Sequence, residues 1–128
     1  MDNRTIRFEP GRKISETFLE FAAPLLADLP SEEPESKARD GLTIACTAWN
    51  AVIFADVLND NQYVDQIRDL AQNKPEARQM IETLIARKRS LFAEDHRMIG
   101  TWEVTRTEDG INLRADARDP YSVARAAS

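Results

Sequence analysis

The only histidine of the chain, His96, stands in the sequence Glu94-Asp95-His96-Arg97. A neighbouring carboxylate can orient an imidazole for proton transfer near neutral pH. The alternative is a polar residue in a loop between a helix and a strand. The sequence around His96 offers no pattern of serine or cysteine that supports a nucleophilic triad, so we predict no catalytic residue. His96 stays a candidate for a cleft that the sequence does not define.

Two pairs of aspartates are spaced four residues apart, Asp56 with Asp60 and Asp65 with Asp69. In a continuous helix each pair would share a face and could hold a hard cation. Turn-forming residues at 59–61 interrupt the pattern, so Asp60 is expected to cap a helix and the other acids to face solvent. We predict no metal site, but Asp56 and Asp60 remain candidates for a cleft because Asp56 shares a face with apolar residues.

A group of basic residues could contact phosphate groups: Arg87, Lys88, Arg89 and Arg97, joined by Arg106 and Arg114. Acidic residues in the same region dilute the positive charge, and the chain as a whole carries a net charge of −5. Such a balance argues against broad, non-specific binding to nucleic acid. The group is therefore either a solvated face or a weak site for an anion or nucleic acid.

The remaining sequence signals exclude several kinds of site. One cysteine, Cys46, and one histidine cannot form a structural zinc site, a disulfide or a C-x-x-C redox motif. No phosphate-binding glycine loop, nucleophile elbow or zinc-protease motif is present, so no cofactor is predicted. The charged N-terminal sequence lacks an apolar signal segment, and the single cysteine suits a reducing compartment. We expect a cytoplasmic protein that does not enter a membrane.

Four segments carry apolar residues at helical spacing: 13–25, 42–58, 63–71 and 75–92. Residues 42–58 are apolar on nearly every side except for a strip of Thr43, Thr47 and Asn50, which predicts a helix at the centre of the fold. Pro24 removes the helical hydrogen bond to the carbonyl of Glu20, so the first helix should kink or divide there.

The C-terminal part predicts a β-hairpin over 99–117, because Asp109-Gly110 suits a two-residue turn. That turn pairs Val104 with Ala115 and Trp102 with Ala117, and it places every apolar side chain on one face. A slip of one residue would fail this test. Residues 4–9 also alternate and are a possible third strand.

These elements predict an α+β fold, mostly helical, in which about four helices pack with the hairpin. Residues 1–119 are expected to form one domain and 120–128 a flexible tail. For function we expect a non-enzymatic protein that acts through protein–protein contacts, with self-association into a homodimer. Two alternatives stay open: a nucleic-acid-associated regulator that uses the basic residues, and an enzyme or metal-dependent activity around the cleft candidates.

Overall fold

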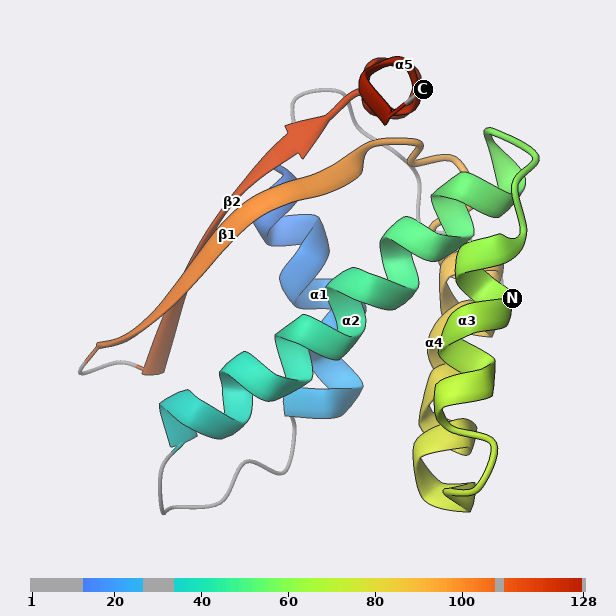
Figure 1. Cartoon of the computed structure of the whole chain (residues 1–128). Coiled ribbons are helices and arrows are strands. Elements are labelled where there is room, and N and C mark those ends of the chain that lie inside the picture. The colour runs from blue at the N-terminus through green and yellow to red at the C-terminus, as the bar shows by residue number, and fades with distance from the viewer. Residues whose placement is uncertain (1–12, 27–33, 108–109, 128) are drawn as a thin grey trace, which may run out of the picture.

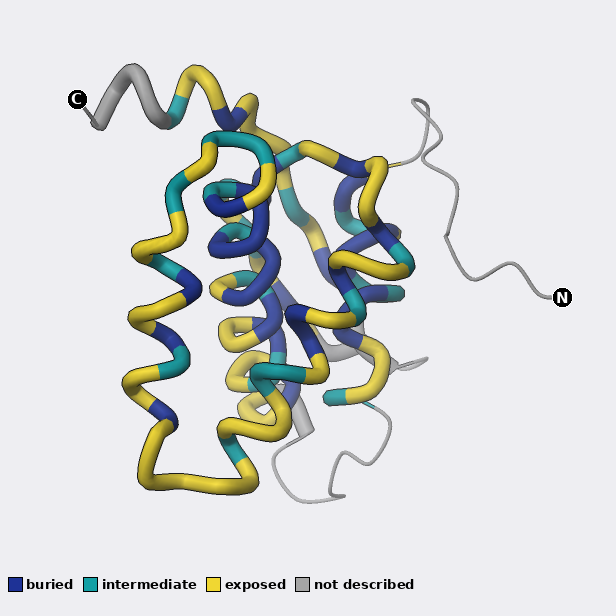
Figure 2. The backbone as a smooth tube through the Cα atoms, turned by 90° about the vertical axis from the view of Figure 1, so that its right-hand side faces the viewer, coloured by how far each residue is buried: buried dark blue, intermediate teal, exposed yellow. Residues whose placement is uncertain are grey.

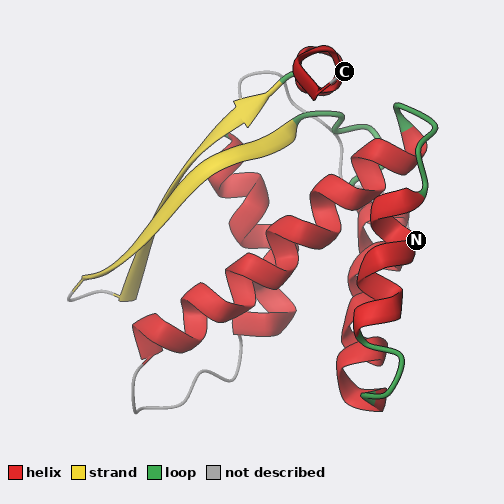
Figure 3. Cartoon of the chain, in the orientation of Figure 1, coloured by secondary structure: helices red, strands yellow, loops and turns green. Residues whose placement is uncertain are grey.

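The fold consists of five helices and one hairpin in a computed structural model that describes residues 13–26, 34–107 and 110–127. The elements are α1 (Ile14–Leu26), α2 (Pro34–Asp56), α3 (Gln62–Leu70), α4 (Pro75–Leu91), β1 (Met98–Thr107), β2 (Gly110–Arg118) and α5 (Pro120–Ala127). Figures 1 and 3 show α2 crossing the centre of the molecule, with the hairpin and α1 on one side and the α3–α4 pair on the other. The predicted α+β class is confirmed.

Helix α2 is the element that contacts most of the others, because it packs against α1, α3, α4 and β1. Its apolar positions are buried: Leu42, Ala45, Ala48, Trp49, Val52 and Ile53. The Trp49 ring meets Phe21 of α1 and Phe92 after α4 edge to face, with ring centroids 5.1 and 5.6 Å away. Such contacts add to the stabilisation from burial. The prediction of a central buried helix is confirmed, although the helix begins earlier, at Pro34.

Helix α1 passes through Pro24 as a single helix, where the sequence led us to expect a kink or a division. Pro24 cannot donate to the carbonyl of Glu20. Arg87 of α4 replaces the missing donor, because its Nη2 lies 2.7 Å from that carbonyl oxygen and its Nε lies 3.0 Å from the carbonyl oxygen of Phe21. A side chain from a distant helix thus satisfies the backbone group that the proline leaves without a partner.

The hairpin has the predicted faces but a different register. Val104 pairs with Leu113 and Trp102 with Ala115, so β2 is shifted by two residues from the predicted pairing. Thr107 pairs with Gly110, which leaves residues 108 and 109 between them; these two residues lie outside the described part of the chain. A shift of two residues keeps each side chain on its predicted face. Val104 and Leu113 are accordingly buried, and Glu103 and Arg114 are exposed.

Three side chains of α2 hold the backbone of β1 and of the residue before it. Asn50 forms two hydrogen bonds with Ile99, donating from Nδ2 to its carbonyl oxygen (2.9 Å) and accepting its N–H at Oδ1 (2.8 Å). The Trp49 indole donates to the carbonyl of Arg97 at 2.7 Å, and Arg39 donates to that of Val104 at 3.2 Å. These bonds satisfy peptide groups along the edge of β1 that β2 does not reach.

Of the predictions for the two ends of the chain, the structure can be compared only with the C-terminal one. Residues 120–127 were assigned to a tail, but they form α5, in which Pro120 is buried. The third-strand prediction for 4–9 falls outside the described residues. Figure 2 shows that the surface where α3 joins α4 is exposed, and each of residues 72–76 is exposed there.

Replacing Asn50 by alanine should destabilise the fold by about 2 to 3 kcal/mol, because it leaves the N–H and C=O of Ile99 without partners in a partly buried position. Chemical denaturation of both proteins measures the difference. Lys37→Ala is the matched control on the same helix, because Lys37 is exposed and outside the groove lining and should change stability by less than about 0.5 kcal/mol. Equal losses in the two variants would contradict the role of Asn50.

Cysteine pairs can distinguish the observed hairpin register from the predicted one. The host for this test carries Cys46→Ala. In it, the double variant with Thr105→Cys and Asn112→Cys should form an intramolecular disulfide readily, because these two positions face each other across the strands. Thr105→Cys with Arg114→Cys matches the register predicted from the sequence and should form it poorly. Mass spectrometry after mild oxidation measures both yields, and the opposite ranking would show the observed register to be wrong.

Candidate functional site

Lys88, expected on a basic strip, lies in the interior with only 3 % of its surface exposed. Its Nζ donates to the carbonyl oxygens of Phe92 at 2.7 Å and Asp95 at 2.9 Å, and it lies 4.4 Å from the centroid of the Trp49 ring. The carbonyls beyond the end of α4 need donors, and the ring face attracts a cation. Burial lowers the pKa of Lys88 from 10.5 to about 8, although Asp95 and Asp56 oppose this shift.

Arg97 also takes part in the fold. Its Nε lies 2.9 Å and its Nη2 2.7 Å from the two carboxylate oxygens of Asp95, which is buried. The backbone N–H of Arg97 donates to the same carboxylate at 3.1 Å. A buried carboxylate requires a partner of this kind. The pair therefore fixes the turn that leads from α4 into β1.

The other candidates are distributed over separate places. Arg89 forms an exposed ion pair with Asp56 at 3.1 Å, which joins α4 to the end of α2. Asp60 accepts the N–H of Gln62 at 3.1 Å just before α3, although the N-cap position of that helix is occupied by Asn61. His96 is exposed on the turn between α4 and β1.

Neither the carboxylates nor the thiol form a chemical site in the described residues. Within residues 13–26, 34–107 and 110–127, no three histidine, cysteine, aspartate or glutamate side chains are grouped so as to hold a metal ion. Burial raises the pKa of the Cys46 thiol from 9.0 to about 11, and a hydrogen bond with Trp102 opposes this shift only in part. A thiol with so high a pKa is a poor nucleophile.

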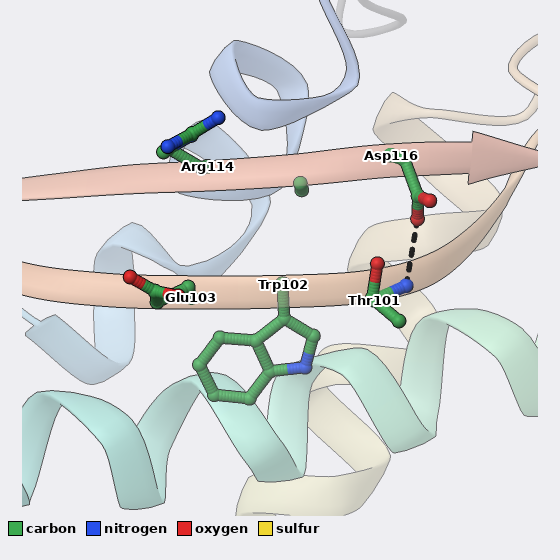
Figure 4. A pocket seen from close by; sticks show the side chains of 6 residues that line it. Thr101, Trp102, Glu103, Arg114 and Asp116 are labelled. Atoms are coloured by element: carbon green, nitrogen blue, oxygen red, sulfur yellow. Dashed lines mark hydrogen bonds between the residues drawn. The ribbon is translucent and has the colours of Figure 1, made fainter.

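A polar hollow of about 370 Å³ lies along the hairpin, lined by residues 101–103 and 114–116. Figure 4 shows the Trp102 ring turned toward α2, with the side chains of Thr101, Glu103, Arg114 and Asp116 around the strands. Asp116 accepts the N–H of Thr101 at 2.6 Å. Acidic and basic groups alternate here, so the hollow has no charge of one sign to select an ion.

An apolar groove of about 170 Å³ lies between α2, α3 and α4. Its lining is almost entirely apolar apart from two threonines: Thr43, Ile44, Thr47, Ala48, Ile67, Leu70 and Ile81. Leu70, the last residue of α3, is 80 % exposed, and Ile44 is 38 % exposed. The neighbouring pair of Arg68 with Glu82, 2.8 Å apart, joins α3 to α4 beside this groove. An apolar hollow beside an exposed leucine can receive an apolar side chain of another molecule.

Comparison of the chain with protein-family models, with curated proteins and with solved structures finds no match. Within the described residues, no helix has both the length and the hydropathy needed to cross a membrane. Function is therefore inferred from the geometry of this chain's own residues.

Two features, the burial of Lys88 and the exposure of Leu70, could not be predicted from the sequence. The basic cluster was visible, but its spacing gave no sign that Lys88 points into the core while Arg89 points outward. Leu70 continues the apolar stripe of α3, so the pattern alone placed it with the core. Leu70 is exposed because it is the last residue of α3 and is followed by the exposed turn that connects α3 to α4.

The buried Lys88 predicts a rise in stability at alkaline pH. Between pH 8 and 10.5 the folded protein has released this proton while the unfolded chain still holds it, so the free energy of unfolding increases with pH. The full gain is about 3 kcal/mol for a change in pKa of this size. Denaturation at several pH values, for the protein and for Lys88→Met, isolates this effect as the difference between the two curves. A difference that stays constant across the interval would contradict a buried, titrating Lys88.

Proposed function

We propose that this chain is a non-enzymatic protein that acts through protein–protein contacts and associates with a second copy through the groove between α2, α3 and α4. The observation that supports this proposal is the 80 % exposure of Leu70 beside an apolar hollow of about 170 Å³. Burial of such a leucine in a matching hollow would contribute roughly 1.5 to 3 kcal/mol.

A second copy suits this groove because the projecting side chain and the hollow lie on the same face. A two-fold axis brings each projection to the other molecule's hollow, so one surface supplies both halves of the contact. Leu70 would then enter the space beside Ile44 and Ile81 of the second copy. Two such insertions at one interface reinforce each other.

The alternative functions gain no comparable support from the described residues. Nucleic-acid binding would require cations that are available to phosphates, whereas Arg87, Lys88 and Arg97 direct their donors to backbone or carboxylate groups within the chain. An enzyme would require converging groups, whereas Asp56 is held in an ion pair with Arg89 and Asp60 accepts the N–H of Gln62. The single, poorly reactive Cys46 suits the reducing cytoplasm, where we place the protein.

Leu70→Glu should lower the mass of the associated protein by about half at tens of micromolar, because a charge cannot enter the apolar hollow. Light scattering coupled to size exclusion measures the mass. The helical circular dichroism should not change, because Leu70 is exposed within one molecule. The melting temperature should fall modestly and become independent of concentration, because association no longer stabilises the folded state.

Gln66→Glu is the matched control, since it introduces the same charge one turn earlier at an exposed position of α3 outside the groove lining. It should leave the mass unchanged. A Leu70→Glu protein with the mass of the unmodified protein, or an unmodified protein that is monomeric at this concentration, would remove the proposal.

A further inference from the structure

The outer edge of β2 is the sheet edge that the helices do not satisfy. Ile99 and Val104 turn their peptide groups toward α2, where Asn50 and Arg39 bind them. In an antiparallel pair of this kind, the opposite residue turns its own peptide group outward as well. The partners of Ile99 and Val104 are Ala117 and Leu113, so these two residues, and Ala115 between them, present N–H and C=O groups along the outer edge of β2.

An open hollow borders part of this edge. A hollow of about 470 Å³ lies between α1 and β2, with Lys13 and α1 residues such as Leu19 forming one wall and residues 112–115 the other. Among the described residues, no hydrogen bond from outside the hairpin reaches the backbone of Leu113 or Ala115. An edge with unpaired peptide groups is a template for a strand from another chain.

The charges along β2 indicate which strand would fit. On the exposed face, Asn112, Arg114, Asp116 and Arg118 follow one another at every second position. Within one molecule Arg114 already stands opposite Glu103 of β1. A strand added outside β2 should therefore place an acid opposite Arg114 and a base or neutral group opposite Asp116, since opposite charges across strands are favourable.

We propose that two copies of the chain pair their β2 strands antiparallel, with the two-fold axis at Ala115. This register places Arg114 opposite Asp116 of the second copy, and the symmetry forms that pair twice. It also places Asn112 opposite Arg118 of the second copy. On the inner face the small side chain of Ala115 meets its own copy, and Leu113 meets Ala117 of the second copy.

The neighbouring registers are less favourable for reasons of charge. An axis at Arg114 would place two arginines directly opposite each other, and like charges there are destabilising. An axis at Leu113 would place Asn112 opposite Arg114 of the second copy and Asp116 opposite Gly110 of the second copy, without any ion pair. An axis at Ala117 would place Asp116 opposite Arg118 of the second copy but would align only residues 116–118. The register centred on Ala115 combines two ion pairs with pairing over 112–118.

The product is a four-stranded sheet with helices on one face and a polar outer face. This interface is separate from the groove at Leu70, because the hairpin and the α3–α4 pair lie on opposite sides of α2 (Figure 1). The proposal does not depend on the groove. Both interfaces can operate together, and removal of one leaves particles joined by the other.

Cross-linking at the axis tests the register directly. The host carries Cys46→Ala and Leu70→Glu, so that the native thiol and the groove contact are absent. Ala115→Cys in this host should form a covalent dimer under mild oxidation, because only a residue on a two-fold axis faces its own copy at disulfide distance. Asn112→Cys is the matched control. In this register residue 112 lies opposite residue 118 of the second copy, so the two cysteines at position 112 are offset by six residues along the strands. We expect cross-linking at 115 to be at least about tenfold faster.

A charge substitution supplies the second measurement. In the same host, Arg114→Glu should weaken the dimer by about tenfold or more, because each of two ion pairs becomes a like-charge pair. Thr105→Glu adds the same negative group to the exposed face of β1, away from the interface, and should leave the dimer intact. A monomeric host, faster cross-linking at 112 than at 115, or equal weakening by the two glutamates would overturn the proposal. If the host dimerises while Leu70→Glu has no effect, this interface stands and the groove proposal fails.

Discussion

The two hydrogen bonds between Asn50 and Ile99 are the interaction on which the arrangement depends. A helix cannot pair with a strand through its own peptide groups, because those groups are used within the helix. Asn50 overcomes this restriction, since its amide carries a donor and an acceptor in the same relation as a peptide group. Trp49 and Arg39 extend the contact in both directions along β1. The hairpin is therefore attached to α2 by polar bonds as well as by its apolar face.

The attachment of β1 to α2 leaves β2 as the outer strand of the hairpin. With the outer edge of β1 held by α2, the sheet edge that no other described segment pairs with is the one on β2. On the other side of α2, the short α3 ends at Leu70 before its apolar stripe is covered. The basic residues that the sequence presented as candidates for binding instead stabilise the fold. Arg87 donates to the carbonyl that Pro24 cannot bind, Lys88 donates to the carbonyls after α4, and Arg97 neutralises Asp95. The surfaces that remain suit contacts between chains, which is why we propose a role in association.

Much of the fold was predictable because hydrophobic patterning determines which elements form and which faces are buried. The nearly continuous apolar run at 42–58 could only be a central helix, and the alternation at 102–115 determined the faces of the hairpin. The pattern could not determine its register, because a shift of two residues preserves every face. The functions of Asn50 and Arg87 were also beyond the pattern, since each binds backbone that lies more than forty positions away in the chain. Likewise, no local signal separates the buried Lys88 from its exposed neighbour Arg89.

Native-state hydrogen exchange of the Ile99 amide tests most directly whether Asn50 makes helix and hairpin one cooperative unit. Its N–H donates to the Asn50 side chain and not to β2. If that bond holds the sheet on α2, the amide should exchange only on global unfolding, with the same free energy as the buried amides around Trp49 and Val52. Exchange through a local opening of much lower free energy, while the α2 amides stay protected, would show that the hairpin detaches independently and would contradict this account.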